Sequence, residues 1–147
     1  MSTPPNSASG PDALAAKRAF LGGCHCGALR FEARLDLAAG TVKCNCTYCA
    51  KSRFWHARAA PGDFSVSGEA SEYRGRNPVA RHFFCPTCGV HVHDRIETPN
   101  MLGRPYINVS VACLEDADIA ELIAAPVTYC DGLHNSWTSA PAETRHL

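Results

Sequence analysis

Residues Phe83 to Arg95 read FFCPTCGVHVHDR and combine a metal-binding turn with a strand. The pattern Cys-Pro-x-Cys-Gly is typical of a zinc knuckle, a tight turn whose backbone N–H groups point at the first sulfur. Gly89 can adopt the positive φ that ends such a turn. The candidate strand Val90 to Ile96 follows directly, so a metal bound by Cys85 and Cys88 would lie at the root of a sheet.

A second pair, Cys24 and Cys26, can supply the other half of this site. Residues two apart on an extended chain face the same way and can bind one ion together. The strand expected over Ala28 to Leu35 follows this pair, with apolar and charged residues in alternation. Together with Cys85 and Cys88, the pair supplies the four sulfurs of a closed tetrahedral zinc site that joins two sheets. Four thiolates can also hold an iron–sulfur cluster, but the knuckle favours zinc.

A third group, Cys44, Cys46 and Cys49, lies within six residues and can wrap one ion, so the sequence predicts two zinc ions per chain. A tetrahedral ion with three protein ligands keeps an open position, where chemistry can take place. Three thiolates on a divalent ion leave a net charge of about −1, which suits binding of an incoming thiol as its thiolate better than making hydroxide. A fourth protein ligand would close the site instead, and the candidates are His56, His91, His93, Cys113 and Cys130.

Composition narrows the class of protein. The chain has 147 residues, with 14 Lys and Arg against 14 Asp and Glu and no block of like charge, which gives no electrostatic footprint for nucleic acid or an anionic membrane. No apolar run approaches the roughly 20 residues of a membrane-spanning helix. Nine cysteines without a secretory signal favour the reducing cytosol, where clustered cysteines are more often metal ligands than disulfides.

The chain divides into a Pro/Ser-rich tail, residues 1–19, expected to be disordered or weakly ordered, and a single zinc-binding domain over residues 20–147. After the most Pro/Ser-rich part of the tail, residues 13–20 could form one or two helical turns. One short helix is expected near the C-terminal end, capped by Asp116 or Asp118 and closed by Pro126. The remaining pattern predicts a mainly β fold of small antiparallel sheets stapled by zinc.

Further strands are expected from alternating or β-branched runs bounded by turn residues. They are Thr41 to Cys44, Phe54 to Ala59, Phe64 to Ser67, Glu72 to Arg74, Ala80 to Phe84, Tyr106 to Ala112 and a short strand beginning at Val127.

The cysteine segments resemble the glutathione-dependent formaldehyde-activating enzyme family, which also includes centromere protein V. The resemblance rests on GGCHCGALRFE at Gly22 to Glu32, CNCTYCAKS at Cys44 to Ser52 and FFCPTCGVHVHDR at Phe83 to Arg95. NVSVACL at Asn108 to Leu114 and DGLHNSW at Asp131 to Trp137 extend it over most of the chain.

This resemblance implies a β-tent fold, with a structural zinc on the four-cysteine group and a catalytic zinc on Cys44, Cys46 and Cys49. It also implies a carbon–sulfur lyase reaction that joins formaldehyde and glutathione to S-(hydroxymethyl)glutathione, with a small thiol and a small aldehyde as partners. A non-catalytic zinc module that binds a thiol, peptide or protein is the alternative hypothesis.

Glutathione carries two carboxylates, so its site should offer cationic donors near the open metal. Lys51, Arg53 and Arg95 are the candidates for these contacts. A concave pocket with convergent cations would favour the enzyme over the binding module.

Overall fold

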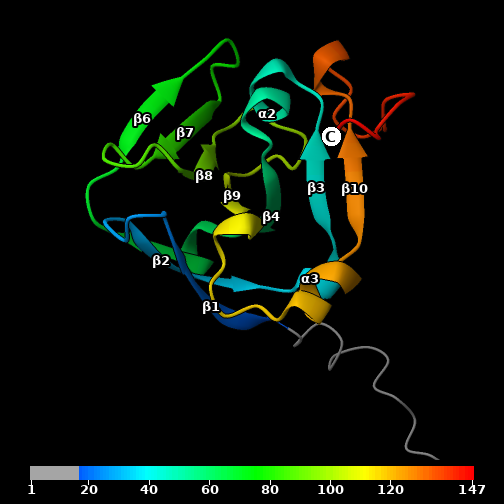
Figure 1. Cartoon of the computed structure of the whole chain (residues 1–147). Coiled ribbons are helices and arrows are strands. Elements are labelled where there is room, and N and C mark those ends of the chain that lie inside the picture. The colour runs from blue at the N-terminus through cyan, green and yellow to red at the C-terminus, as the bar shows by residue number, and fades with distance from the viewer. Residues whose placement is uncertain (1–16) are drawn as a thin grey trace, which may run out of the picture.

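The computed structural model describes residues 17–147 (Figure 1). Its strands are β1 (Arg18–Gly23), β2 (Arg30–Leu35), β3 (Thr41–Cys44), β4 (Trp55–Ala59), β5 (Phe64–Ser67), β6 (Ser71–Arg74), β7 (Ala80–Phe84), β8 (His91–Ile96), β9 (Tyr106–Ser110) and β10 (Val127–Cys130). The α-helices are α2 (Thr47–Ser52) and α3 (Ile119–Ala124). The mainly β fold with a short C-terminal helix is therefore confirmed.

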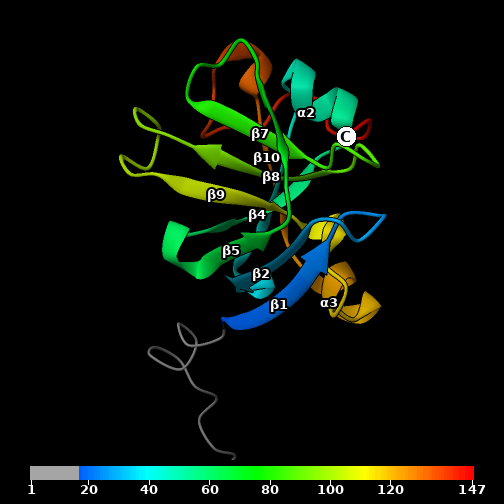
Figure 2. The same ribbon diagram turned by 90° about the vertical axis from the view of Figure 1, so that its left-hand side faces the viewer.

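The strands form two sheets. The smaller sheet has the order β1-β2-β5 and is antiparallel, whereas the larger one has the order β10-β3-β4-β9-β8-β7-β6. Figure 2 shows the smaller sheet as a layer below the larger one. The larger sheet is antiparallel except where β10 runs parallel to β3, a pairing that the sequence analysis did not predict.

The hydrophobic core lies between the two sheets. Strand β2 alternates as predicted, because Phe31, Ala33 and Leu35 are buried while the charged residues between them are exposed. Val92 and Val109 meet this face from the larger sheet. Full burial of each large apolar side chain contributes roughly 1.5 to 3 kcal/mol to stability, so this interface holds the two sheets together.

The N-terminal end of the described chain differs from the expectation. Residues 1–16, which include most of the expected tail and half of the expected helical turns, lie outside the described residues. Residues 18–20 are not helical but begin β1, where Arg18 and Ala19 pair with β2. Burial of Phe20 in the core explains the difference, because a strand directs this ring between the sheets.

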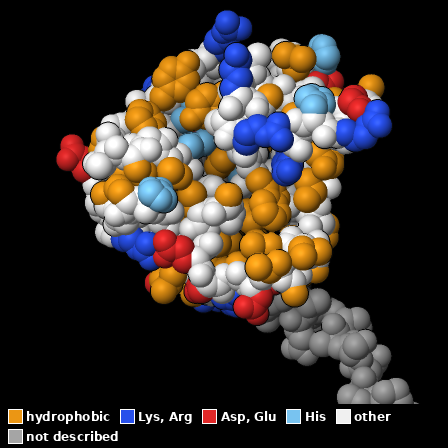
Figure 3. Space-filling view, viewed as in Figure 1, with side chains coloured by type: hydrophobic (Ala, Val, Ile, Leu, Met, Phe, Trp, Pro, Cys, Tyr) orange, Lys and Arg blue, Asp and Glu red, His pale blue; other side chains and the backbone are white. Residues whose placement is uncertain are grey.

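Helix α2 was also not predicted, and it begins immediately after Cys46. The Cys46 sulfur accepts a hydrogen bond from the Cys49 N–H at the helix N-terminus, and Arg53 ends the helix with a left-handed φ of 55°. Figure 3 shows Lys and Arg side chains near α2 and hydrophobic side chains over α3. Ile119 and Ile123 of α3 are exposed. No helix in residues 17–147 is long and apolar enough to cross a bilayer.

Candidate metal centres

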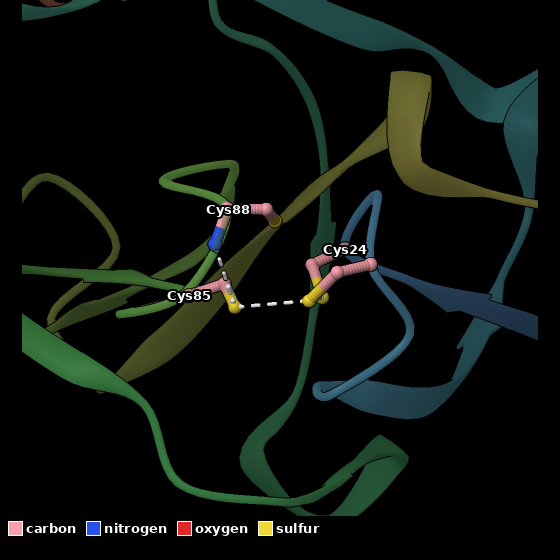
Figure 4. A group of neighbouring side chains, drawn as sticks. Cys24, Cys85 and Cys88 are labelled. Atoms are coloured by element: carbon pink, nitrogen blue, oxygen red, sulfur yellow. Dashed lines mark hydrogen bonds between the residues drawn. The ribbon is translucent and has the colours of Figure 1, made fainter.

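The first cysteine cluster brings together the loop after β1 and the turn between β7 and β8 (Figure 4). The Sγ atoms of Cys24 and Cys26 are 3.7 Å apart, and those of Cys26 and Cys85 are 3.6 Å apart. A tetrahedral zinc with bonds of about 2.3 Å holds its sulfurs about 3.8 Å from one another. All four sulfurs, with that of Cys88, lie within 4.8 Å of one another, so the donor set fits one zinc ion.

Backbone N–H groups orient these sulfurs as the knuckle pattern predicts. Leu29 donates to the Cys24 sulfur at 3.3 Å, and the N–H groups of Thr87 and Cys88 donate to the Cys85 sulfur at 3.4 Å. Gly89 has the expected positive φ, 79°. Backbone N–H groups of Cys26 and Val90 lower the pKa of the Cys88 thiol to about 6, which favours the thiolate that a metal requires.

The second cluster is built from one continuous segment. Cys44 ends β3, Cys46 precedes α2, and Cys49 lies in its first turn. The Cys46 N–H donates to the Cys44 sulfur and the Cys49 N–H to the Cys46 sulfur, both at 3.4 Å. The three sulfurs lie within 4.8 Å of one another, and no fourth His, Cys, Asp or Glu donor from residues 17–147 joins them.

Strand register places several polar residues on one face of the larger sheet, the side away from the core. Val42 pairs with His56 and Cys44 pairs with Cys130, so these side chains share that face. Arg58 lies two residues beyond His56 and therefore points to the same side. We call this side the outer face.

Cys130 is the candidate fourth ligand that comes nearest to the second cluster. It is the register partner of Cys44 in the parallel β3–β10 pair. The neighbouring thiols of Cys130, Cys46 and Cys49 lower the pKa of Cys44 well below the ordinary value, and the Cys44 sulfur raises the pKa of Cys130. Like Cys130, the other four candidates do not lie within the three-sulfur group.

Each of those four has a different environment. His56 is buried on the outer face, and burial lowers its pKa to about 4. His91 bonds Asp94, and His93 lies on the core side, where its ring is parallel to that of Phe83 at 4.7 Å. Cys113 is buried in the core as a small apolar side chain.

The segment after β10 clamps the second cluster. The Asn45 side chain donates to Asp131 at 2.8 Å, and it accepts a hydrogen bond from the Leu133 N–H at 3.0 Å. Gly132 approaches so closely that a Cβ there would lie 2.6 Å from the Cys44 sulfur. A side chain at this position would therefore displace a metal ligand. Sequence reasoning missed this clamp because its partners are far apart in the chain.

The three cationic residues predicted to contact the glutathione carboxylates differ in where their side chains lie. Lys51 is exposed on α2, and the Arg53 guanidinium donates to the His146 carbonyl at 2.5 Å. Arg95 pairs with Arg81 and Ile107, whereas its neighbour Asp94 faces the outer side. Because successive strand residues alternate, Arg95 points away from the face that carries Cys44.

Arg58 is a cation that sequence reasoning missed, although its spacing from His56 along β4 was the available signal. It lines a hollow of about 550 Å³ on the outer face. Val42, Cys130 and Trp137 also line this hollow, so it reaches the register partner of Cys44, although none of the three cluster cysteines lines it. The hollow has the size of a small-molecule site, which spans roughly 300 to 1,000 Å³.

Comparison with known proteins places the chain in a family. Residues 19–130, more than half of the chain, match the family described as glutathione-dependent formaldehyde-activating enzyme. A crystal structure of a Rhodobacter sphaeroides protein is similar, with 29% sequence identity and a TM-score of 0.61 over 74% of this chain and 99% of that chain. The matched range includes both cysteine clusters and Cys130. The chain therefore belongs to the glutathione-dependent formaldehyde-activating enzyme family.

Proposed function

We propose that the chain is a zinc-dependent enzyme of the carbon–sulfur lyase class that joins formaldehyde to glutathione, giving S-(hydroxymethyl)glutathione. The observation that carries this proposal is the three-sulfur group of Cys44, Cys46 and Cys49, which no fourth donor from the described residues completes. Family membership supports the same reaction. All nine cysteines are free thiols, as metal binding requires, which supports a reducing compartment such as the cytosol.

Zinc bound to the three thiolates would supply a coordination position at which an incoming thiol is held as its thiolate. The reaction itself is an addition: the glutathione sulfur forms a bond to the carbonyl carbon, and the carbonyl π bond breaks. The aldehyde oxygen takes up one proton, which balances the proton lost by the thiol. The chain contributes chiefly by holding both reactants in contact, because the orientation of reactants alone accounts for much of many rate enhancements.

The hollow beside Cys130 supports the choice of a thiol with charged ends. Arg58 at its edge can pair with one glutathione carboxylate, while Met101 and Trp137 provide apolar walls. Lys51 and Arg53, at the end of α2, are the candidates for the second carboxylate. Arg95 is not part of this proposal because it faces the core side.

A non-catalytic zinc module is the second candidate function, and one observation favours it. The Cys130 thiol lies beside the Cys44 sulfur, so a small shift of β10 would add a fourth sulfur to the second cluster. A zinc with four thiolates has no open position for a substrate. The chain would then bind a partner through its surface instead of performing chemistry at the metal.

Cobalt substitution separates the two functions, because the visible spectrum of Co²⁺ reports how many sulfurs bind it. For the enzyme, adding glutathione should move the spectrum of the second cluster from a three-sulfur to a four-sulfur pattern. Formaldehyde exchange, measured by NMR exchange spectroscopy, should then exceed the rate in buffer, where thiols add to formaldehyde unaided. A four-sulfur spectrum before glutathione is added, with exchange no faster than in buffer, would reject the enzyme and favour the non-catalytic zinc module.

Cys46→Ser is the informative variant, and Cys113→Ala is its matched control. The first removes a ligand of the second cluster and should abolish both the spectral shift and the enhanced exchange. The second removes a buried thiol that neither cluster uses, so both signals should persist.

A further inference from the structure

Two histidines and one aspartate form a compact cluster on the outer face, apart from both cysteine groups. His82 in β7 and Asp94 in β8 are register partners, so their side chains lie on the same side of the sheet. His91 would face the opposite side in a regular strand, because it is three residues from Asp94. A register shift between Phe83 and Phe84 passes over Val92 and turns His91 to the side of Asp94.

The donor atoms of the three side chains converge. The Asp94 Oδ1 atom is 2.8 Å from His82 Nδ1 and 2.6 Å from His91 Nε2, and all three atoms lie within 4.8 Å of one another. Imidazole nitrogens bind zinc at about 2.0 to 2.1 Å and carboxylate oxygens at about 2.0 to 2.2 Å, so one ion can reach all three donors with small side-chain shifts.

The cluster is buried, as a site that binds an ion tightly can be. The side chains of His82, His91 and Asp94 are 9%, 10% and 3% exposed. The Tyr48 ring is stacked on that of His82, with centroids 3.7 Å apart, so α2 covers the cluster from one side. Burial alone would raise the pKa of Asp94, but hydrogen bonds from the two histidines outweigh it, and the carboxylate is retained.

Unpartnered polar atoms lie near the cluster. His91 Nδ1 and, nearby on the outer face, Asn108 Oδ1 and His56 Nδ1 are buried and have no hydrogen-bond partner. Asn108 is the register partner of Asp94 on the side away from His82, so its side chain adjoins the same carboxylate. Buried polar atoms are nearly always paired with protein, water or an ion. These three atoms are therefore available to bind water or groups attached to an ion.

We propose that His82, His91 and Asp94 form a third metal site, which binds a divalent first-row transition ion through two imidazole nitrogens and one carboxylate oxygen. Such a donor set suits Zn²⁺, Fe²⁺, Co²⁺ or Ni²⁺ and leaves positions open for solvent. It shares no residue with the cysteine clusters, so the proposal does not depend on the function proposed for them. The sulfur-free donor set also makes this site distinguishable from the others by spectroscopy.

The test uses the full chain, free of any affinity tag and loaded with two zinc ions per chain, so that the cysteine clusters are filled and the third site is free. Equilibrium dialysis against Ni²⁺, followed by elemental analysis, should find one nickel bound while the zinc in the cysteine clusters is retained. X-ray absorption at the nickel edge should show a first shell of nitrogen and oxygen only. No bound nickel, or nickel with sulfur ligands, would overturn the proposal and leave a hydrogen-bond network at this position.

Variants identify the ligands. His91→Ala should weaken nickel binding by more than the about 10- to 100-fold that loss of an outer partner costs, with the zinc content unchanged. Asp94→Asn serves as the second variant if His91→Ala does not fold. His146→Ala removes an exposed histidine and is the control, so equal loss in this variant would count against the site.

Discussion

The two cysteine clusters differ in what they connect. The first takes its sulfurs from two loops, with the contacting Cys26 and Cys85 separated by 59 positions in the sequence, and it lies where the two sheets meet. The second takes all its sulfurs from the six residues that join β3 to α2. A metal in the first cluster closes a long loop and ties distant elements together, whereas a metal in the second orders only a local turn.

Burial does not separate the clusters in the same way, because each contains buried and accessible cysteines. In the first cluster, Cys24 and Cys85 belong to the core, whereas Cys26 is exposed and Cys88 is partly buried. In the second, Cys44 is buried and Cys46 and Cys49 are partly buried. The contrast between the clusters therefore rests on the elements that they connect.

The largest expected effect is loss of folding in Cys85→Ser. Structural zinc contributes about 10 to 16 kcal/mol in small zinc-dependent folds, which equals or exceeds the roughly 5 to 15 kcal/mol that stabilise a typical domain. This variant should be insoluble or lack cooperative thermal unfolding. Cys46→Ser should fold, as measured by circular dichroism, and contain one zinc instead of two. If both variants lost their structure equally, the contrast between the clusters would be wrong.

How far the sequence predicted these clusters depends on how local each interaction is. The spacing of Cys85 and Cys88 directly before β8 specified a knuckle, and N–H bonds to sulfur confirm it. The strands Thr41–Cys44 and Ala80–Phe84 were predicted with their observed bounds, because alternation and turn residues act over a few positions.

Long-range pairing could not be predicted in this way. Alternation alone puts His91 on the same side as His93, and only the register shift against β7 reverses this. Helix α2 was missed because six residues give no helical period, and its N-terminus depends on the Cys46 sulfur instead of a usual capping residue. The parallel β3–β10 pair that aligns Cys44 with Cys130 joins segments far apart in the chain.

Metal removal tests the same contrast without mutation. A chelator added in stages should extract one zinc first, from the second cluster, which orders only a local turn, while the circular dichroism spectrum stays unchanged. The second zinc should leave only as the chain unfolds, because the first cluster ties loops of the two sheets together. Release of both ions in one step, with unfolding, would show that the second cluster also supports the fold.

A smaller effect is expected from the clamp on the second cluster. Asn45→Ala removes the hydrogen bonds to Asp131 and Leu133 that hold the segment after β10 against the cysteine loop. Loss of such an outer contact typically weakens metal binding by about 10- to 100-fold. Competition with a chromophoric chelator should show this decrease for one zinc only. A change at both sites would mean that the clamp supports the whole fold.

The smallest effect, and the sharpest test of the contrast, comes from Cys130→Ser. If the Cys130 thiol only donates a hydrogen bond to the Cys44 thiolate, serine can replace it as the donor, and zinc affinity should change by no more than about fivefold, the equivalent of about 1 kcal/mol.

Cys130→Val removes the donor entirely and should weaken binding slightly more while leaving a three-sulfur cobalt spectrum. A change from four sulfurs to three in either variant would instead identify Cys130 as a metal ligand. Both clusters would then be closed four-thiolate sites, and the division between a structural and an open metal would fail. Since a closed site cannot accept a thiol, the enzyme proposal would fail with it.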